Sequence, residues 1–421
     1  MGLFLSFTEE KLYGITVGLH PPWNWGEAVV TRNIFLVIKK HLLKHIKIYS
    51  MVDANRYPCG KSLNTGLDIG LNTNLDIRHV NTSHVLDFSV RTAVDIIKDL
   101  SAKNVRRSSQ VFIHVAGVNE LVLWTLLSLF KKLNMRHYRS HLIIHNYGPI
   151  TQKIELLPYE IRTYIEARMF SVLTTSMITK RMFINNKKVF YIPAPYIFTP
   201  EDELTTTCTG FEGCNLLNHV LADSKNKDIL LYVGHLRRER FNYPLVLSAL
   251  KRLVSIGHKD VVLLIVAPKS SKDYDVNYKH ALFMSKLASS LQIADHVNIM
   301  VGNICENCKR KLFENSKIFL FLPLHRSQSM DPPMSVLEAM AHGNVVITTR
   351  YLSLPYMIKS GHNGILLSGH SVEGLTSIVS KLLSNDNYFH QISRNAITYV
   401  MNNHSSSVVA RYLSTLYESL K

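Results

Sequence analysis

The stretch from Met330 to Gly343, MDPPMSVLEAMAHG, decides how this chain folds. An apolar run, Ile318–Pro323, comes before it and is typical of a buried parallel strand. The two prolines suit the first turn of a helix, where a missing N–H group removes no hydrogen bond, and Gly343 suits the left-handed position that ends a helix. A second apolar run, Val345–Thr349, follows. The stretch therefore predicts a strand, a helix that opens at proline, and another strand.

The start of this helix is a candidate anion site. The first turn of a helix offers unpaired N–H groups and about half a positive charge, which together suit a phosphate group. Ser335 and Val336 lie in that turn, and Glu338 follows in the early part of the helix. An ordinary strand–helix–strand unit with no ligand explains the same pattern.

Strand-like and helix-like segments alternate throughout the rest of the chain. Apolar strand-like runs lie at residues 12–19, 46–49, 111–115, 142–145, 189–193, 229–234, 261–266 and 297–300. Segments with helical character lie at residues 28–43, 88–100, 121–133, 158–170, 244–256, 279–291, 309–315, 372–383, 388–401 and 408–420. This alternation predicts α/β domains in which helices cover both faces of a parallel sheet.

Residues 201–227 break the alternation, because they are rich in threonine and then in charge. We interpret them as a linker between an N-terminal domain of residues 1–200 and a second domain of residues 228–404. Residues 53–84 are polar and rich in Asn and Gly, and they support no assignment. The predicted architecture is two doubly wound, Rossmann-like domains that face each other across a cleft.

Charge is distributed unevenly along the chain. The formal net charge is +17, with 25 Lys and Arg against 13 Asp and Glu in residues 1–200, and 23 against 18 in residues 201–421. A basic half suits an anionic partner such as lipid headgroups, a polyanionic polymer or nucleic acid. The surplus is dispersed and forms no basic arm, which favours a membrane surface over nucleic acid.

The composition, 46% hydrophobic and 19% charged, indicates an ordered globular protein. No apolar run approaches the ~20 residues that a membrane-spanning helix needs, and we expect no secretory signal. The five cysteines do not suggest a disulfide framework, which favours a reducing compartment. Cys305 and Cys308 have the spacing of a redox or zinc pair. Because no second pair and no paired histidine motif completes a zinc site, we predict a structural role for these cysteines and no metal.

Several landmarks, in order along the chain, resemble the retaining nucleotide-sugar glycosyltransferases of the GT-B fold, specifically glycosyltransferase family 4. The resemblance is strongest from Ile229 to about Leu367. It rests on Val233–Leu236 with Arg240 five residues after His235, on Pro333–Ala341 as the second half of the family's E-x7-E element, on Gly343–Thr348 and Asn363–Leu367, and on Tyr191–Pro195 in the first domain.

The resemblance implies roles for residues of the second domain. Arg240 stands where the family has a cation that binds the donor diphosphate, and a guanidinium group suits phosphate. A solvated arginine is the alternative. His235 stands in place of an arginine and can donate a hydrogen bond to phosphate. Glu338 is expected to accept hydrogen bonds from the nucleotide ribose, and amides near Ser335 and Val336 are expected to hold the phosphates.

The resemblance also implies roles in the first domain. His145 ends a predicted strand and matches the family's active-site histidine near the sugar, while His114 has a weaker claim. Gly26 occupies the place of the family's glycine-rich loop, where backbone N–H groups approach the phosphate or the acceptor. A structural histidine and a plain turn glycine are the alternatives. The final helix, residues 405–421, is expected to pack back onto the first domain.

The chain departs from the family pattern where the first glutamate of the E-x7-E element belongs. Met330 stands at that position, eight residues before Glu338, and a thioether cannot replace the hydrogen bonding of a carboxylate. Asp331 follows directly, and a shift of the loop would bring its carboxylate into the same space.

The resemblance implies a metal-independent, hexosyltransferase-type enzyme that moves a sugar, with retained configuration, from a nucleotide-diphosphate donor such as a UDP- or GDP-sugar. The expected acceptor is a glycan, a lipid-linked molecule or another anionic molecule, and no cofactor is expected beyond the donor. We expect a cytoplasmic protein whose basic N-terminal domain can contact the inner membrane face. The alternative, favoured by Met330 and His235, is a degenerate, non-catalytic protein of the same fold that binds glycans or an active partner.

Overall fold

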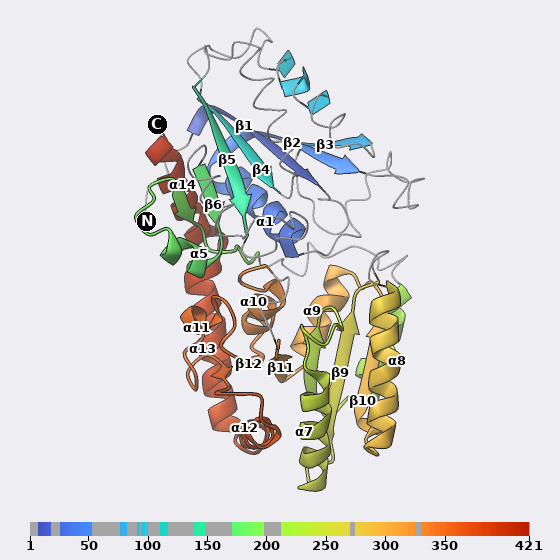
Figure 1. Ribbon diagram of the computed structural model, residues 1–421. Coiled ribbons are helices and arrows are strands. Elements are labelled where there is room, and N and C mark those ends of the chain that lie inside the picture. Colours follow the sequence, from blue (N-terminus) through green and yellow to red (C-terminus); the bar gives the residue numbers. More distant parts are fainter. Residues whose placement is uncertain are drawn as a thin grey trace. The chain divides into compact units, whose positions relative to one another are not determined.

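The computed structural model describes residues 7–17, 26–52, 76–81, 91–92, 94–96, 98–99, 110–116, 139–147, 171–197, 212–269, 274–324 and 330–420 (Figure 1). The chain divides into two compact units. Unit 1 comprises residues 1–68, 72–197 and 404–421, and unit 2 comprises residues 69–71 and 198–403.

Unit 1 contains a parallel sheet of seven strands. The strands are β1 (Phe7–Val17), β2 (Leu43–Val52), β3 (Asp76–Asn81), β4 (Gln110–Ala116), β5 (Arg139–Asn146), β6 (Ser171–Thr174) and β7 (Val189–Tyr191), in the order β3-β2-β1-β4-β5-β6-β7. Described helices of this unit include α1 (Gly26–His41), α5 (Met177–Met182) and α14 (Ser406–Leu420). The strand order reverses between β1 and β4, as in a doubly wound fold.

Unit 2 contains a parallel sheet of six strands. The strands are β8 (Asp228–Val233), β9 (Val261–Ala267), β10 (Val297–Val301), β11 (Ile318–Phe321), β12 (Val345–Thr348) and β13 (Ile365–Leu366), in the order β10-β9-β8-β11-β12-β13. The helices are α6 (Glu212–Asp223), α7 (Tyr243–Ser255), α8 (Tyr274–Ser290), α9 (Glu306–Glu314), α10 (Met334–Ala341), α11 (Leu354–Met357), α12 (Val372–Ser384) and α13 (Asp386–His404). Here the order reverses between β8 and β11, so the predicted pair of doubly wound domains is confirmed.

Burial of apolar strands explains why these segments form the sheet of unit 2. Every residue of β9 and of β11 is buried, as expected for strands that helices cover on both faces. Burial of one Val, Leu or Ile side chain contributes about 1.5–3 kcal/mol, so these short runs outweigh the weak intrinsic preferences of the chain. The amphipathic α7 adds Leu247, Leu250 and Leu253 to the same core.

The opening stretch folds largely as its pattern predicts. Strands β11 and β12 pair in parallel on either side of α10 in the chain, and Gly343 has a left-handed φ of +79°. One detail is different: Pro333 is the N-cap of α10, with an extended ψ of 124°, so the helix begins after the prolines at Met334. The missing N–H group of a proline removes no hydrogen bond at this position either.

The structure adds two elements in segments where the sequence predicted none. Strand β3 lies within residues 53–84, where polar composition gave no strand signal, and it pairs with β2 at the edge of the sheet. Residues 212–223 of the predicted linker form α6, which buries Cys214 and Leu217 and packs against α9 and β10. The predicted helices at 121–133 and 158–170 lie outside the described residues.

The last helix belongs to unit 1. Helix α14 packs against α1 and buries Leu413, Leu416 and Tyr417. The ring centroids of Tyr417 and of Phe112 in β4 lie 4.4 Å apart. At the start of this segment the N–H of Tyr196 donates to the carbonyl oxygen of His404 at 2.8 Å. Residues 404–421 therefore complete the core of unit 1.

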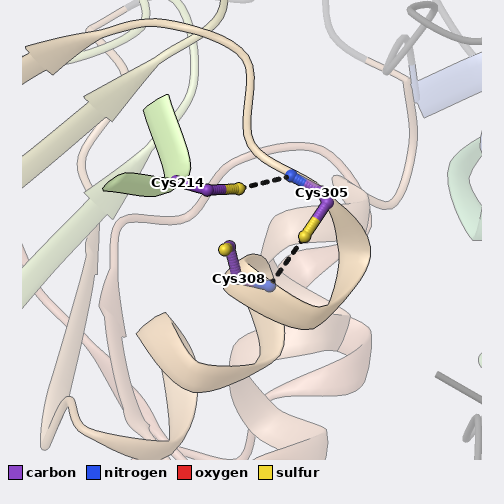
Figure 2. A group of neighbouring side chains, drawn as sticks. All are labelled: Cys214, Cys305 and Cys308. Carbon is purple, nitrogen blue, oxygen red and sulfur yellow. Dashed lines mark hydrogen bonds between the residues drawn. The ribbon is translucent and has the colours of Figure 1, made fainter. Parts of the chain in front are cut away.

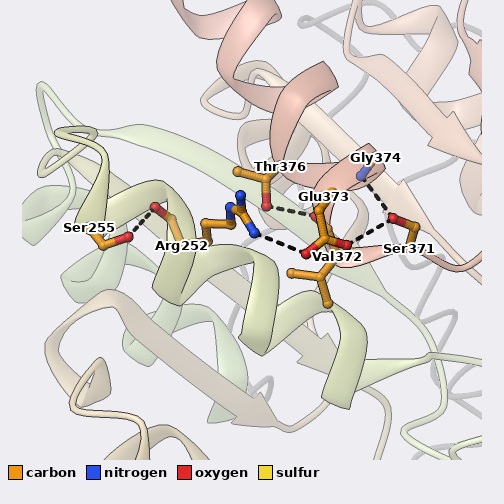
Figure 3. A network of polar contacts seen from close by, with 7 residues as sticks. All are labelled: Arg252, Ser255, Ser371, Val372, Glu373, Gly374 and Thr376. Atoms are coloured by element: carbon orange, nitrogen blue, oxygen red, sulfur yellow. Dashed lines mark hydrogen bonds and ion pairs between the residues drawn. The ribbon is translucent and has the colours of Figure 1, made fainter.

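Charged side chains join α7 to α12 only at the surface. Arg252 donates to a carboxylate oxygen of Glu373 at 2.9 Å, and Ser371 caps α12 by accepting from the N–H of Gly374 at 3.1 Å (Figure 3). The side chains of Arg252 and Glu373 are 51% and 68% exposed, so solvent screens their attraction and apolar packing holds the two helices. Among the described helices, none combines the length and apolar character that crossing a membrane requires.

Candidate functional site

The carboxyl ends of β8 and β11 mark the candidate site of unit 2. Open parallel sheets bind ligands outside the carboxyl ends of their strands, where the strand order reverses. The chain leaves β8 at Val233 and continues into Gly234 and His235, and after β11 it reaches Met330 and the start of α10. The predicted donor residues thus follow the two central strands.

The turn after β8 is held in a defined conformation. Gly234 has a φ of +154°, and a Cβ atom there would lie 2.9 Å from the hydroxyl of Tyr232, so this position requires glycine. The same hydroxyl donates to the carbonyl oxygen of His235 at 2.7 Å. The ring of Tyr232 also stacks on Phe241, with 3.9 Å between centroids. His235 is therefore carried by a rigid backbone.

Arg240 follows in the same turn region. Its N–H donates to the carbonyl oxygen of Arg237 at 2.9 Å, and its side chain is half-buried. Burial raises the pKa of Tyr232 above its usual range, and the positive charge of Arg240 acts in the opposite direction. A permanent cation thus lies near the end of β8, and its contact with phosphate stays a prediction.

Helix α10 presents an N-terminus without a side-chain cap. Its N-cap residue, Pro333, makes no side-chain capping bond, and a helix N-terminus without such a cap suits an anionic ligand. Ser335 is half-buried, and Val336 is fully buried. The N–H of Val336 donates to the carbonyl oxygen of Pro333 at 3.1 Å, and its predicted contact with the nucleotide-sugar donor stays a prediction.

Glu338 is part of a buried ion pair that joins α10 to α9. The ammonium nitrogen of Lys309 lies 2.8 Å from a carboxylate oxygen of Glu338 and 2.9 Å from one of Glu306. The side chains of Lys309 and Glu338 are only 18% and 13% exposed. Burial alone would lower the pKa of Lys309, but Glu306 and Glu338 outweigh it and raise that pKa above its ordinary value. Lys309 is therefore charged and fixes the carboxylate of Glu338.

Sequence reasoning missed Lys309 and Glu306. Glu306 and Lys309 are three residues apart on α9, a spacing that predicts a local ion pair. Glu338 lies 29 residues beyond Lys309, and no local pattern relates two positions so far apart. The contact arises because α9 and α10 precede and follow β11, and only the folded sheet brings them together.

Asp331 supports the loop before α10. It is fully buried, and its carboxylate accepts hydrogen bonds from the N–H and the hydroxyl of Ser353, at 3.0 and 2.5 Å. Ser353 is the N-cap of α11, so these bonds join the two loops that flank α10 and β12. A carboxylate with no exposed surface cannot reach a sugar in this conformation. Its substitution for the missing glutamate therefore stays a prediction that the described geometry does not support.

The contact between Asp331 and Ser353 predicts a stability effect. Replacing Ser353 with Ala removes one donor from a buried carboxylate, and we expect the free energy of unfolding to fall by about 1–3 kcal/mol. Urea denaturation of wild type and S353A measures this difference. An unchanged midpoint would contradict the structural role of Asp331.

His145 belongs to a buried chain of hydrogen-bonding groups in unit 1. Its Nε2 lies 2.6 Å from Nδ1 of His114, and its Nδ1 lies 2.6 Å from the hydroxyl of Tyr147. The chain continues at one end to Tyr417 of α14, 3.0 Å from Nε2 of His114, and at the other end to Thr31 of α1, 2.7 Å from Tyr147. His145 thus takes part in a set of hydrogen bonds that joins β4, β5, α1 and the final helix. Its direct partner is His114, the histidine with the weaker claim to a role in the site.

Both histidines are held in the neutral form. Burial, followed by the charge of neighbouring His145, keeps the pKa of His114 well below its usual range. Burial lowers the pKa of His145 to about 3. Each neutral imidazole has one donor and one acceptor nitrogen. Every group in this row of hydrogen bonds therefore has a partner when all the protons point in one direction along the row, or all in the other. Both ring nitrogens of His145 therefore have partners inside unit 1, and its contact with a sugar stays a prediction.

Gly26 is the first residue of α1. The residues before it, including Trp23 and Trp25, lie outside the described residues. A glycine at the start of a helix that follows the central strand β1 occupies the position where doubly wound folds hold phosphate. The predicted role of Gly26 in binding a phosphate or an acceptor stays a prediction.

The sequence of unit 2 matches a known family. Residues 218–399, less than half of the chain, match the family model described as "Glycosyl transferases group 1". The chain is also 26% identical over 186 residues to the D-inositol 3-phosphate glycosyltransferase of Thermobifida fusca (strain YX). This match covers 44% of the chain and 41% of that relative, so it spans less than half the length of the curated protein.

The fold of the whole chain resembles solved structures, among them a glycosyltransferase. A glycosyltransferase from Rickettsia africae ESF-5 gives a TM-score of 0.66 at 17% identity, and the match covers 97% of this chain and 98% of that one. Anabaena Alr3699/HepE in complex with UDP and glucose gives a TM-score of 0.65 at 11% identity, over 97% and 100% of the two chains. Identities this low show a shared fold alone. Residues 218–399 therefore match the glycosyltransferase group 1 family, and the chain as a whole has the GT-B fold.

Proposed function

We propose that this protein is a retaining, metal-independent glycosyltransferase of family 4 type that takes a sugar from a nucleotide-diphosphate donor. The observation that carries the proposal is the pairing of Glu338 with Lys309 beside the uncapped N-terminus of α10. A fixed carboxylate suits the hydroxyl groups of a ribose, and helix N–H groups suit a diphosphate. The matched relatives support this reading, because Anabaena Alr3699/HepE was solved with UDP and with UDP-glucose.

The proposed mechanism depends on stabilising the leaving diphosphate. Negative charge grows on that group as the sugar departs, and preorganised cations and N–H groups lower the free energy of the transition state. Arg240 and the amides near Ser335 supply them, with His235 as a further donor. The leaving phosphate then takes the proton of the acceptor hydroxyl on the same face of the sugar, which retains the configuration without a protein nucleophile.

The acceptor side is proposed from charge alone. The surplus of basic residues in residues 1–200 suits a lipid-linked or otherwise anionic acceptor, or a glycan held at a membrane surface. We therefore propose a cytoplasmic enzyme that contacts the inner membrane face peripherally. Sedimentation with anionic vesicles compared with neutral vesicles, at low and high salt, tests this part.

A thermal-shift comparison with UDP, GDP and ADP tests the donor site. We expect at least one nucleotide to raise the melting temperature of the wild type, and we expect the rise to disappear in E338A and in R240A. R252A, which changes an exposed arginine of the same unit, is the matched control and should keep the shift. No shift with any nucleotide would contradict the donor proposal.

A degenerate, non-catalytic binding protein is the second candidate. It is favoured by Met330 in the position of a glutamate and by the buried carboxylate of Asp331, whose oxygens bond to Ser353. Nucleotide binding without hydrolysis or transfer of any UDP- or GDP-sugar would favour this candidate over the enzyme.

A further inference from the structure

Three cysteines from two separate segments meet in the core of unit 2. The sulfur atoms of Cys214, Cys305 and Cys308 all lie within 4.8 Å of one another (Figure 2). Each residue is at most 3% exposed. Cys214 is in the first turn of α6, and Cys305 and Cys308 begin α9, so 91 residues of chain separate the two segments. Structural zinc sites are four-coordinate and use Cys and His ligands, so three converging sulfur atoms supply three of the four positions of such a site.

We propose that Cys214, Cys305 and Cys308 bind a zinc ion through their thiolates. Zinc is held at about 2.3 Å from each sulfur, which places tetrahedral sulfur ligands about 3.8 Å apart. The observed separations within 4.8 Å reach this arrangement by small side-chain rotations. Three thiolates leave one position of the tetrahedron for a fourth ligand.

Backbone N–H groups around the cluster donate hydrogen bonds to two of its sulfur atoms. The N–H of Cys305 donates to the sulfur of Cys214 at 3.3 Å, and the N–H of Cys308 donates to the sulfur of Cys305 at 3.3 Å. Cys305 is also the N-cap of α9, and the positive end of a helix stabilises a thiolate. Backbone N–H groups and a helix N-terminus thus offset part of the negative charge that three thiolates bring together.

Close backbone contact keeps the two segments in place. The N–H of Gly213 donates to the carbonyl oxygen of Asn303 at 3.2 Å, and a Cβ atom at Gly213 would lie 2.7 Å from that oxygen. A larger residue would therefore push α6 away from the loop before α9. Gly213 permits the approach that brings Cys214 to the other two cysteines.

The oxidation state of Cys305 decides when the site can be loaded. Cys214 and Cys308 are reduced, whereas Cys305 is disulfide-bonded. A thiol or phosphine reductant supplies the two electrons that break this bond, and solvent supplies two protons, which leaves both sulfurs as thiols. Zinc then displaces the protons of its three thiol ligands to solvent. The site is therefore a property of the reduced protein.

The zinc site adjoins the proposed donor site through one helical turn. Cys305, Glu306, Cys308 and Lys309 share the start of α9, and the N–H of Lys309 donates to the carbonyl oxygen of Cys305 at 2.9 Å. A bound zinc ion would fix this turn and hence the ammonium group that bonds to Glu338. Zinc binding itself does not depend on the proposed transferase activity, and only its effect on nucleotide affinity rests on that function.

Metal analysis of the full chain tests the proposal. The protein is purified with a phosphine reductant from cells supplied with zinc, and bound zinc is measured by mass spectrometry. We expect one zinc ion per chain in the wild type and in C59S, and close to none in C214S and C308S. Because these substitutions also change buried packing, apo wild type is titrated with Co²⁺ as a second measurement, and thiolate-to-cobalt charge-transfer absorption is expected.

Two results would overturn the proposal. One is reduced wild-type protein that holds no stoichiometric zinc and shows no thiolate-to-cobalt absorption. The other is a C214S variant that binds as much zinc as wild type. The cysteines would then form only a reversible disulfide and would not hold a metal ion. Retained zinc together with no nucleotide shift would leave the metal site standing and would contradict the proposed donor function alone.

Discussion

Replacing Lys309 with Met should both destabilise unit 2 and weaken nucleotide binding. The substitution leaves Glu306 and Glu338 close together without the cation that both contact, at 2.9 and 2.8 Å. Removing one partner from a buried pair costs about 3–5 kcal/mol, and the partial exposure of these side chains reduces our expectation to about 2–4 kcal/mol. We also expect nucleotide affinity to fall about tenfold, because the loss of one positive charge beside the proposed donor site weakens the attraction for a diphosphate.

A surface pair of the same unit is the matched control for K309M. Lys317 lies 2.6 Å from Asp228, but the two side chains are 43% and 28% exposed. Exposed pairs contribute about 0–1 kcal/mol, so K317M should change the denaturation midpoint little and leave nucleotide binding intact. Equal losses in K309M and K317M would show that the buried pair has no special role.

The double mutant K309M/E338Q separates the two effects of Lys309. If Lys309 acts by neutralising Glu338, removing both charges should restore part of the lost stability. Nucleotide affinity should stay low in the double mutant, because the carboxylate that is proposed to bind the ribose is absent. Urea denaturation measures the stability, and calorimetric titration with the nucleotide found by thermal shift measures the affinity.

The sequence predicts the central strands of the two sheets better than the strands at their edges. Central strands such as β9 and β11 are continuous apolar runs, and burial on both faces makes such runs unmistakable. Strand β3 at the sheet edge carries Asp76, Arg78 and His79 in six residues, so hydrophobic pattern could not reveal it. Helix α6 was hidden for another reason: the segment before it is polar, and only contact with α9 and β10 shows where the linker ends.

The candidate site shows the same division between local and long-range information. Glu338 and Arg240 were predicted because each lies in a short motif next to a strand. Lys309 was missed because its partner is 29 residues away. The convergence of the three cysteines was not predicted because Cys214 is 91 residues from Cys305, and a CxxC pair alone supplies only half of a metal site. Ligand sets assembled from distant segments become visible only when the fold is known.

Unit 1 should lose stability in mild acid because it buries neutral histidines. Burial lowers the pKa of His145 to about 3 and that of His404 to about 4, although the bond from His404 to the carbonyl oxygen of Ala194 acts in the opposite direction. The ordinary pKa is 6.5, so the unfolded chain binds protons that the folded chain does not. Their stabilisation is fully present above about pH 6.5 and is lost as the pH falls toward the folded values.

The expected slope is about 1.4 kcal/mol per pH unit for each of these histidines between pH 6 and pH 4.5. Denaturant unfolding at several pH values, followed by the near-ultraviolet signal, measures it. H404Q keeps a donor for Ala194 and removes one titrating group, so its stability should fall less steeply by about that amount. H390Q replaces an exposed histidine of α13 and controls for the substitution itself. If the free energy of unfolding depends on pH in the same way in wild type and H404Q, His404 is not held neutral by burial. The same comparison with H145Q tests the row of hydrogen bonds that joins α14 to β5.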